Sequence, residues 1–334
     1  MSTVTKPRRS LPRRVAARVI PLPVRQAISS RLIGTRFFPA PPPRSRAAAE
    51  AAPRRSTPPP RRVMDIVLPP APGAEVGPGT LHIDVPPYMY IPRVLDEKGL
   101  AGYEPYGLDA FLTLVERAPE GAVFDVGANV GLYGLLAAAY SDRTVHAFEP
   151  APDTAQAARD IARASGLDVT VGEIALGDDN GTATLYLSDS TDSSNSLNPD
   201  FRAHSKEIVV PLETVDEYVA RTGVRPTLLK IDTETTEHSV IAGAEKLIRE
   251  HRPWILAEVL YGLSEDNLHE VMDPHGYTIY HLNGPGPRPV VDRMVGDSTW
   301  VYYMFLFAPE PVDDQFWARM NAWREALEST RATA

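Results

Sequence analysis

From Leu81 onward, short apolar runs alternate along the chain with stretches of helical spacing. Runs without interleaved polar residues are typical of parallel strands that are covered on both faces. The alternation therefore predicts a doubly wound α/β sheet. The predicted strands are Val123–Val126, Val145–Phe148, Val169–Ala175, Leu228–Ile231, Trp254–Leu260, Tyr277–His281 and Val301–Phe307. The predicted helices are Leu132–Ala139, Ala151–Ala164 and Glu237–Glu250.

Two segments add to this pattern. Between the third and fourth strands, "GTATLYLSDS" and "KEIVVPL" predict an inserted hairpin, whose strands are joined by the polar loop "STDSSNSLNPDF". Near the end, Phe316, Met320, Trp323 and Leu327 recur at helical spacing. This stripe predicts a C-terminal amphipathic helix within residues 311–334 that packs on the domain, with a dimer face as the alternative.

Charge divides the chain unevenly. Residues 1–62 hold 15 of the 34 Lys and Arg but one of the 43 Asp and Glu, and they are rich in proline. Such a segment buries too little apolar surface to fold, so we expect a disordered basic tail. Contact with an anionic membrane surface is the alternative. Residues 63–100 are expected to form a linker and N-terminal extension, with Pro/Gly-rich 71–80 as the linker, and residues 101–310 the α/β domain.

Some sites are excluded by composition. The chain has no cysteine, so it can form neither a disulfide nor a thiol nucleophile. No apolar run approaches the length of a membrane-spanning helix. We expect a cytoplasmic protein, or one peripheral to the membrane. Residues 63–334 sum to a charge of −23, which disfavours nucleic acid as a partner because its phosphates would be repelled.

The strongest motif is "VFDVGANVGLYGLLAAA". A predicted strand ends near Asp125, and Gly127 and Gly131 would let the backbone turn sharply and point its N–H groups at a ligand. Glu149 ends the next predicted strand, where a carboxylate can accept both hydroxyls of a ribose. The spacing is typical of a nucleoside-containing cofactor.

Two cofactors fit this outline. A nicotinamide site uses G-x-G-x-x-G, but Asn129 and Leu132 stand where its second and third glycines belong. S-adenosylmethionine sites use acid-x-G-x-G-x-G, and Asp125, Gly127 and Gly131 match three of its four places. Asn129 takes the fourth, and asparagine tolerates a positive φ well. The leading acid could pair with the cationic methionine portion, so S-adenosylmethionine is favoured.

Further strings occur in order along the chain: "VHAFEPAPDT", "IALGDDNGTATLYL", "SSNSLN", "VPLETVDEYV", "LLKIDTETTEHSVIAGAEKLI" and "PWILAEVL". Together with "FDVGANVGLYG" they resemble the FkbM-type family of S-adenosylmethionine-dependent O-methyltransferases over roughly residues 105–308. The resemblance implies a Rossmann-like class I methyltransferase fold, with a seven-stranded, mostly parallel sheet whose last strand is antiparallel. It also implies methyl transfer to a hydroxyl of a sugar, a glycolipid or a natural-product scaffold.

The resemblance also implies roles for residues. Asp125, Gly127, Asn129 and Gly131 would form the methionine-side loop, Glu149 would hold the ribose, and the Glu173–Leu176 stretch, including Ala175, would lie near adenine. The family pattern K-I-D-x-E-G-x-E reads here Lys230-Ile231-Asp232-Thr233-Glu234-Thr235-Thr236-Glu237. Threonine thus replaces the family glycine at position 235. Because a β-branched residue resists positive φ, we expect either a reshaped turn or one that needs no positive φ.

The acidic turn is the candidate catalytic centre. Asp232 and Glu234 follow a strand, at the edge of the sheet where ligands bind in open α/β folds. Asp232 is the first candidate for orienting or deprotonating the acceptor hydroxyl, supported by Glu234 and Lys230, and Glu258 ends the neighbouring strand. Asp232 capping the next helix, with Glu237 in its first turn, is the structural alternative.

Other roles stay open. Asp232, Glu234 and Glu258 could instead bind Mg²⁺, which would acidify adjacent hydroxyls. His204 and His238 are secondary candidates for the base. Ser193, Ser194, Asn195 and Ser196 would border the acceptor pocket. The partner is expected to be a small-molecule or glycan acceptor. A catalytically impaired methyltransferase-like binding protein and, less favoured, a nicotinamide-dependent oxidoreductase are the alternatives.

Overall fold

The computed structural model describes residues 61–329. The predicted basic tail and its membrane contact lie outside these residues, apart from Arg61 and Arg62. Both arginines form ion pairs with the folded part, Arg61 with Asp84 and Arg62 with Asp96. Across the described residues, no helix combines the length and apolar character that a membrane span requires.

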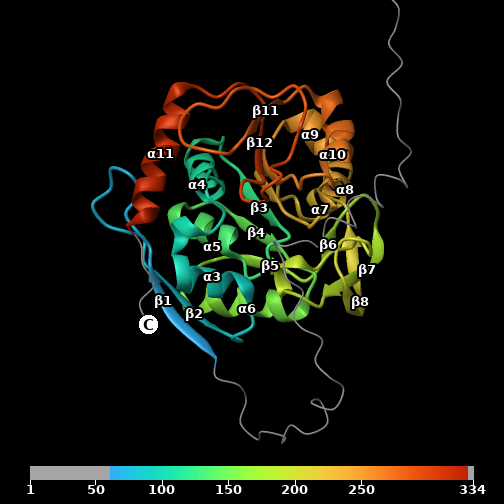
Figure 1. Ribbon diagram of the computed structural model, residues 1–334, viewed down its shortest axis with the longest axis horizontal. Coiled ribbons are helices and arrows are strands. Elements are labelled where there is room, and N and C mark those ends of the chain that lie inside the picture. The colour runs from blue at the N-terminus through green and yellow to red at the C-terminus, as the bar shows by residue number, and fades with distance from the viewer. Residues whose placement is uncertain (1–60, 330–334) are drawn as a thin grey trace, which may run out of the picture. The chain divides into compact units, whose positions relative to one another are not determined.

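A seven-stranded sheet forms the centre, in the order β5-β4-β3-β9-β10-β12-β11 (Figure 1). Its strands are β3 (Ala122–Val126), β4 (Val145–Phe148), β5 (Thr170–Gly172), β9 (Pro226–Ile231), β10 (Trp254–Glu258), β11 (Thr278–His281) and β12 (Met304–Ala308). Neighbouring strands from β5 through β4, β3 and β9 to β10 pair in parallel. Strand β12 is antiparallel to both β10 and β11. The order confirms the predicted Rossmann-like fold with its antiparallel last strand.

Helices cover both faces of this sheet (Figure 1). The first face packs against α3 (Tyr90–Lys98), α4 (Gly107–Arg117), α5 (Leu132–Tyr140), α6 (Pro152–Ala164) and α11 (Asp314–Glu328). The second packs against α7 (Val215–Thr222), α8 (Glu237–Ala242), α9 (Glu245–His251) and α10 (Glu265–Met272). Because side chains alternate along a strand, Val123 belongs to the first apolar layer and Phe124 to the second. Short 3₁₀ turns lie at Leu100–Gly102 (η1), Asp192–Ser194 (η2) and Asp273–His275 (η3).

The inserted hairpin is confirmed. Strand β7 (Gly181–Ser188) pairs with β8 (His204–Glu213) in antiparallel register, and β6 (Ala175–Leu176) completes a three-stranded sheet in the order β6-β8-β7. The single strand predicted over Val169–Ala175 is wrong. Central strand β5 ends at Gly172, and the exposed Glu173 separates it from β6, which pairs with β8.

Two other predicted elements differ from the structure. The helix predicted over Glu237–Glu250 is two helices, α8 and α9, separated at Gly243. A Cβ at Gly243 would lie 1.9 Å from the carbonyl oxygen of Gly177, so the chain passes too closely there for a side chain. The last strand begins at Met304 rather than Val301. Asp297 holds the preceding residues in a turn by accepting the backbone N–H groups of Thr299, Val301 and Tyr302.

The segment expected to be a linker and extension folds onto the domain. Strands β1 (Arg62–Val67) and β2 (Thr80–Val85) form an antiparallel hairpin, and the predicted linker at 71–80 lies mainly in its connection. Ile66 and Ile83 are buried in the same apolar cluster as Ile161 of α6. Residues 62–98 therefore contribute to the main core.

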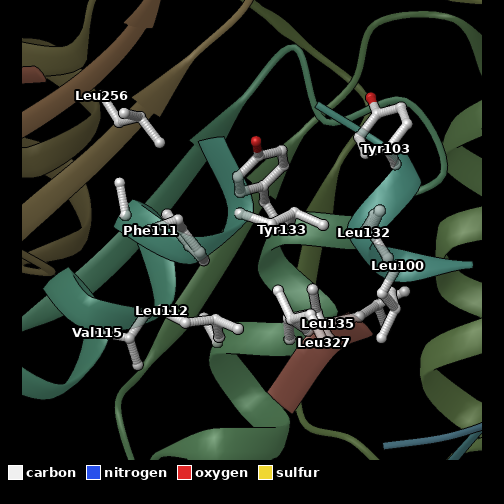
Figure 2. Packing of buried hydrophobic residues seen from close by; sticks show 14 of the residues in the cluster. Leu100, Tyr103, Phe111, Leu112, Val115, Leu132, Tyr133, Leu135, Leu256 and Leu327 are labelled. Atoms are coloured by element: carbon white, nitrogen blue, oxygen red, sulfur yellow. The ribbon is translucent and has the colours of Figure 1, made fainter. Parts of the chain in front are cut away.

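The predicted C-terminal helix is confirmed as α11, and it packs on the domain. Asp313 caps its start by accepting the N–H of Phe316 at 2.8 Å. Figure 2 shows Leu327 beside Leu135 in the apolar layer that also contains Leu112. Trp323 is fully buried, with its ring edge-on to Tyr140 at a centroid distance of 4.8 Å.

Replacing Trp323 by alanine should test whether α11 belongs to the folding core. Loss of a buried aromatic ring typically costs about 3–5 kcal/mol, because the cavity relaxes only partly. We expect Trp323→Ala to lower the free energy of unfolding by about this amount in denaturant titration. Glu325→Ala, at an exposed position of the same helix, should change it by less than about 0.5 kcal/mol. If Trp323→Ala changed the free energy of unfolding as little as Glu325→Ala, the helix would be dispensable for folding.

Candidate functional site

A cleft lies at the carboxyl end of the parallel strands, where β3, β4, β9 and β10 end. It encloses about 930 Å³ of space between protein atoms, including the open mouth. The predicted residues Gly127, Asn129, Glu149, Ala175 and Asn195 line it, as do all four predicted catalytic residues: Lys230, Asp232, Glu234 and Glu258.

The loop after β3 has the backbone conformation that its sequence predicts. Gly127, Asn129 and Gly131 all have positive φ, at 76°, 51° and 79°. Asparagine therefore does adopt the left-handed conformation in the place of a glycine. A Cβ at Gly127 would lie 1.7 Å from the carbonyl oxygen of Asp232. Only glycine allows the two loops that form the cleft floor to come this close.

The N–H groups of this loop are engaged within the protein, which differs from the expectation that they face a ligand. Gly127 and Ala128 donate to the carbonyl oxygen of Phe148, at 2.9 and 3.0 Å. The Asn129 N–H donates to Glu149, and the Gly131 N–H to the carbonyl of Ala128. The bonds to Phe148 and Glu149 tie the loop to the end of β4.

Glu149 lies at the end of β4 with 6% of its surface exposed. Oε2 accepts the N–H of Asn129 at 2.7 Å and Oε1 that of Ala151 at 2.9 Å. Each carboxylate oxygen has a second lone pair, so both can still accept from a hydroxyl in the cleft. Burial raises the pKa of Glu149 to about 7, although the two N–H donors act in the opposite direction.

Asp125 does not line the cleft among the described residues, although the sequence suggested that it faces the methionine portion. It is 1% exposed, and its Oδ2 accepts the Gly134 N–H in the first turn of α5 at 2.8 Å. The carboxylate therefore stabilises the start of the helix. Its Oδ1 is buried without a hydrogen-bond partner.

An apolar wall stands on the β5–β6 side of the cleft. Ile174, Ala175 and Leu176 line it, together with Phe148 from the end of β4. This is the stretch expected to lie near adenine. A flat aromatic group could pack there while Glu149 accepts hydrogen bonds from an adjoining sugar.

Lys230 and Asp232 form the central ion pair. Lys230 is 2% exposed, and its Nζ lies 2.7 Å from Oδ2 of Asp232. Burial alone would lower the pKa of Lys230, but Asp232, Glu104 and Asp125 outweigh burial and raise it. The ammonium also lies 4.7 Å from the centre of the Tyr133 ring, within cation–π range. Lys230 is therefore a fixed positive charge beneath the cleft.

Glu237 organises the turn that follows Asp232. It is fully buried, and its Oε1 accepts the backbone N–H groups of Thr233 at 2.8 Å and Thr235 at 3.2 Å. Burial raises its pKa to about 7. Glu237 thus satisfies backbone groups of the turn before α8, and no side chain among the described residues caps the helix, so the capping alternative for Asp232 is not what the structure contains.

Thr235 has a backbone conformation that glycine adopts readily. Its φ is 84°, and Glu234 beside it also has a positive φ of 55°. The expectation that this position needs no positive φ is therefore wrong. The Thr235 side chain is held at the turn, since Asn198 Nδ2 donates to its Oγ1 at 2.9 Å. Strained backbone of this kind commonly occurs at functional sites.

Three carboxylates gather beside the ion pair. Oxygens of Asp232, Glu237 and Glu258 lie within 4.8 Å of one another, a grouping able to hold a metal ion. The set differs from the predicted Asp232, Glu234 and Glu258. Oε2 of Glu237 and Oε2 of Glu258 are buried without a hydrogen-bond partner. Burial and the neighbouring acids Asp232 and Glu234 raise the pKa of Glu258 well above its usual range.

The serine-rich loop is tied to the acidic turn. Ser196 donates from Oγ to the carbonyl of Glu234 at 2.6 Å and is nearly buried, so it holds the loop rather than lining the cleft. Ser194 is also buried outside the cleft lining, whereas Ser193 and Asn195 line it. Of the four residues predicted to border the acceptor pocket, two thus line the cleft and two lie buried behind it.

Neither candidate histidine lines the cleft. His204 lies at the start of β8, with its ring tilted against that of Tyr186 at a centroid distance of 4.7 Å. His238 belongs to α8, where burial lowers its pKa. Carboxylates and tyrosines are therefore the titratable groups closest to Lys230.

Sequence reasoning missed several cleft residues. Tyr90, Tyr103, Glu104, Tyr133, Asp192 and Tyr303 line the cleft but follow no predicted strand end. Asp192 joins two walls, because its Oδ1 accepts the Tyr90 N–H at 2.9 Å and its carbonyl accepts from Asn129 Nδ2 at 3.2 Å. "YEPYG", with its two tyrosines around an acid, was the available signal for Tyr103 and Glu104.

Thr235→Gly and Thr235→Ala should separate the cost of the positive φ from the loss of the Asn198 contact. Both variants lose Oγ1, but only alanine keeps a Cβ in the left-handed conformation. In denaturant titration, we expect the free energy of unfolding of the glycine variant to exceed that of the alanine variant by about 1 kcal/mol.

Glu270, exposed within α10, provides the matched comparison. There the alanine variant should be the more stable by about 1 kcal/mol, because glycine disfavours a helix. If the alanine variant at position 235 were as stable as the glycine variant or more stable, the result would contradict the positive φ.

Comparison with known proteins agrees with this geometry. Residues 125–279 match the model of the methyltransferase FkbM domain. The 31-O-demethyl-FK506 methyltransferase FkbM of Streptomyces tacrolimicus is 28% identical over 209 residues, which cover 54% of this chain and 77% of that relative.

Solved structures are more distant. A methyltransferase FkbM from Methylobacillus flagellatus KT is 19% identical, with 56% of this chain and 43% of that chain covered and a TM-score of 0.38. The magnesium protoporphyrin IX methyltransferase of Synechocystis PCC 6803 is 13% identical, with 60% and 74% covered and a TM-score of 0.34. The fold assignment therefore relies on the strand order itself. Residues 125–279 of this chain therefore resemble the methyltransferase FkbM domain, in agreement with the family that the sequence motifs indicated.

Proposed function

We propose that the protein transfers a methyl group from S-adenosylmethionine to a hydroxyl of a sugar, a glycolipid or a natural-product scaffold. The observation that carries the proposal is one continuous cleft with Glu149 and an apolar wall at one end and the Lys230–Asp232 pair at the other. The first end suits an adenosine, and the second suits a hydroxyl that must lose a proton.

The cofactor end fits an adenosyl group on three counts. Glu149 presents two acceptor oxygens at the end of β4. Ile174 and Leu176 offer an apolar surface beside it. Gly127 brings the floor of the cleft within contact of Asp232, so a ligand lying on this loop would reach the acidic turn.

The charge of the cleft favours a neutral or cationic ligand. Its lining contains Glu104, Glu149, Asp192, Asp232, Glu234 and Glu258, and Lys230 is the one cation among the described lining residues. The sulfonium and ammonium of S-adenosylmethionine are compatible with this field, whereas the pyrophosphate of a nicotinamide cofactor would be repelled. Hydroxyl groups of a neutral acceptor can donate to the free carboxylate oxygens.

When bound, S-adenosylmethionine would supply a methyl group for in-line displacement by the acceptor oxygen. Asp232 would accept the hydroxyl proton, since its carboxylate lines the cleft beside Lys230. Lys230 would hold that carboxylate in one orientation through the 2.7 Å ion pair. Glu258 could orient the acceptor through Oε2, which has no protein partner. Thr235 adopts a positive φ, which glycine adopts readily, and this supports an intact rather than an impaired site.

Cofactor binding should depend on pH through Glu149. A raised pKa of about 7 means that the carboxyl is protonated below that pH, when it accepts hydrogen bonds poorly. Affinity for S-adenosylhomocysteine, measured by calorimetry, should fall about tenfold between pH 8 and pH 6. Glu149→Gln should bind weakly with little pH dependence, while Glu120→Gln, at an exposed position, should behave as wild type. Binding of NAD but not of S-adenosylhomocysteine would reject the proposal.

Asp232→Asn should separate chemistry from binding. With an acceptor from a screen using labelled S-adenosylmethionine, turnover should fall by about 10²–10⁴-fold, the usual contribution of a positioned base. Affinity for S-adenosylhomocysteine should stay within about threefold, because the carboxamide has the same shape. Exposed Asp142→Asn provides the control.

The same assay distinguishes Lys230 from a metal ion as the source of positive charge. Because the ammonium already pairs with Asp232, we expect full turnover in excess EDTA. Loss of turnover in EDTA and its return with Mg²⁺ would instead favour a metal at Asp232, Glu237 and Glu258. No turnover with any acceptor, despite cofactor binding, would favour a binding protein.

A further inference from the structure

Glu104 is a buried acid of the cleft that follows no predicted strand. It is 5% exposed and lines the cleft. Its side chain accepts a hydrogen bond from Tyr133 Oη. Tyr103, its neighbour in sequence, also lines the cleft and is buried.

The backbone around Glu104 is strained. Glu104 has φ 43° and Tyr106 has φ 69°, both in the region that favours glycine. The turn is closed by a hydrogen bond from the Gly107 N–H to the Glu104 carbonyl at 2.9 Å. A Cβ at Gly107 would lie 2.8 Å from Tyr133 Oη, so the turn is pressed against that tyrosine. Strain of this kind persists only where surrounding contacts impose it.

Tyr133 connects this turn to Lys230. Its hydroxyl donates to Glu104, while its ring lies 4.7 Å from the Lys230 ammonium. Figure 2 shows that the hydroxyls of Tyr103 and Tyr133 both point away from the apolar layer that contains Leu135 and Leu327. The two rings thus separate the core from a polar layer beneath the cleft.

Electrostatics link Glu104 to the same lysine. Burial is the main cause that raises the pKa of Glu104, and the positive charge of Lys230 acts against it. In turn Glu104 is one of the acids that raise the pKa of Lys230. Lys230 therefore lies in the field of Asp232, Asp125 and Glu104, with the face of Tyr133 beside it.

We propose that Glu104, held by Tyr133 on the strained 103–106 turn, is a positioning residue that fixes the Lys230 ammonium against Asp232 for methyl transfer. This inference rests on the proposed function. The turn supplies a second anion that is linked to the ammonium through Tyr133, so Lys230 is held in place and keeps Asp232 in a single orientation. Glu104 itself acts through Lys230 and not on the acceptor.

A double-mutant cycle between Glu104 and Lys230 tests the coupling without an acceptor. In the full-length wild-type background, Glu104→Gln should lower the denaturant midpoint at pH 8, because Lys230 loses a counter-charge. In a Lys230→Met background, the same substitution should raise the midpoint, because it removes an uncompensated buried acid. Glu97→Gln, at an exposed position of α3, should leave both midpoints unchanged. A shift of the same sign and size in both backgrounds would overturn the proposal.

Turnover supplies the second measurement. Glu104→Gln should lower kcat at least tenfold while KM for the acceptor and affinity for S-adenosylhomocysteine stay within about threefold. Tyr133→Phe should give a smaller loss in the same direction, and Glu104→Gln should cost little more in the Lys230→Met background. The proposal would be overturned if Glu104→Gln lowered kcat by the same factor in both backgrounds. It would also be overturned if Glu104→Gln weakened binding of the acceptor or of S-adenosylhomocysteine and left kcat unchanged. Absence of turnover in the wild type would count against the proposed function instead, and the stability cycle would still decide the coupling.

Discussion

The buried ammonium of Lys230 is the charge around which the cleft is arranged. It projects from the centre of the sheet, is 2% exposed, and pairs with Asp232 at 2.7 Å. A buried cation requires anions nearby, and breaking such a pair usually destabilises a protein by several kcal/mol. Three acids meet that requirement: Asp125 on β3, Asp232 directly after β9, and Glu104 in the 103–106 turn. They also leave the cleft with an excess of negative charge.

Backbone geometry places these charges. Gly127 and the carbonyl of Asp232 approach so closely that a side chain at Gly127 is impossible, which brings the cofactor loop and the acidic turn together. The Glu237 carboxylate holds the turn by accepting the backbone N–H of Thr233, and Ser196 and Asn198 hold it from the loop that joins β7 and β8. The small three-stranded sheet is therefore attached, through this loop, to the turn that bears the candidate catalytic acids. Ala175 and Leu176 of β6 and Leu185 of β7 line the cleft.

Much of the fold could be predicted from local pattern. Short apolar runs identified the central strands, because strands covered on both faces need no polar positions. The predictions failed where one run contributes to two sheets, at Gly172 and Glu173, and where a close approach at Gly243 divides a helix. In both places the deciding contact lies far along the chain. The contribution of residues 62–98 to the main core was missed for the same reason, since Pro/Gly-rich sequence resembles a linker whether or not its ends pair.

The sequence alone indicated the family resemblance, the candidate cofactor loop and the acids at strand ends, because a strand's carboxyl end is a fixed place in an open α/β sheet. It also identified Thr235 as an anomaly. Only the tertiary structure decided that Thr235 adopts a positive φ, that Asp125 serves the start of α5, and that Tyr133 links Glu104 to Lys230. Those outcomes depend on which side chains from distant segments meet in a low-dielectric interior. Burial and partner geometry arise only when the chain folds, so the spacing of residues along the sequence cannot predict them.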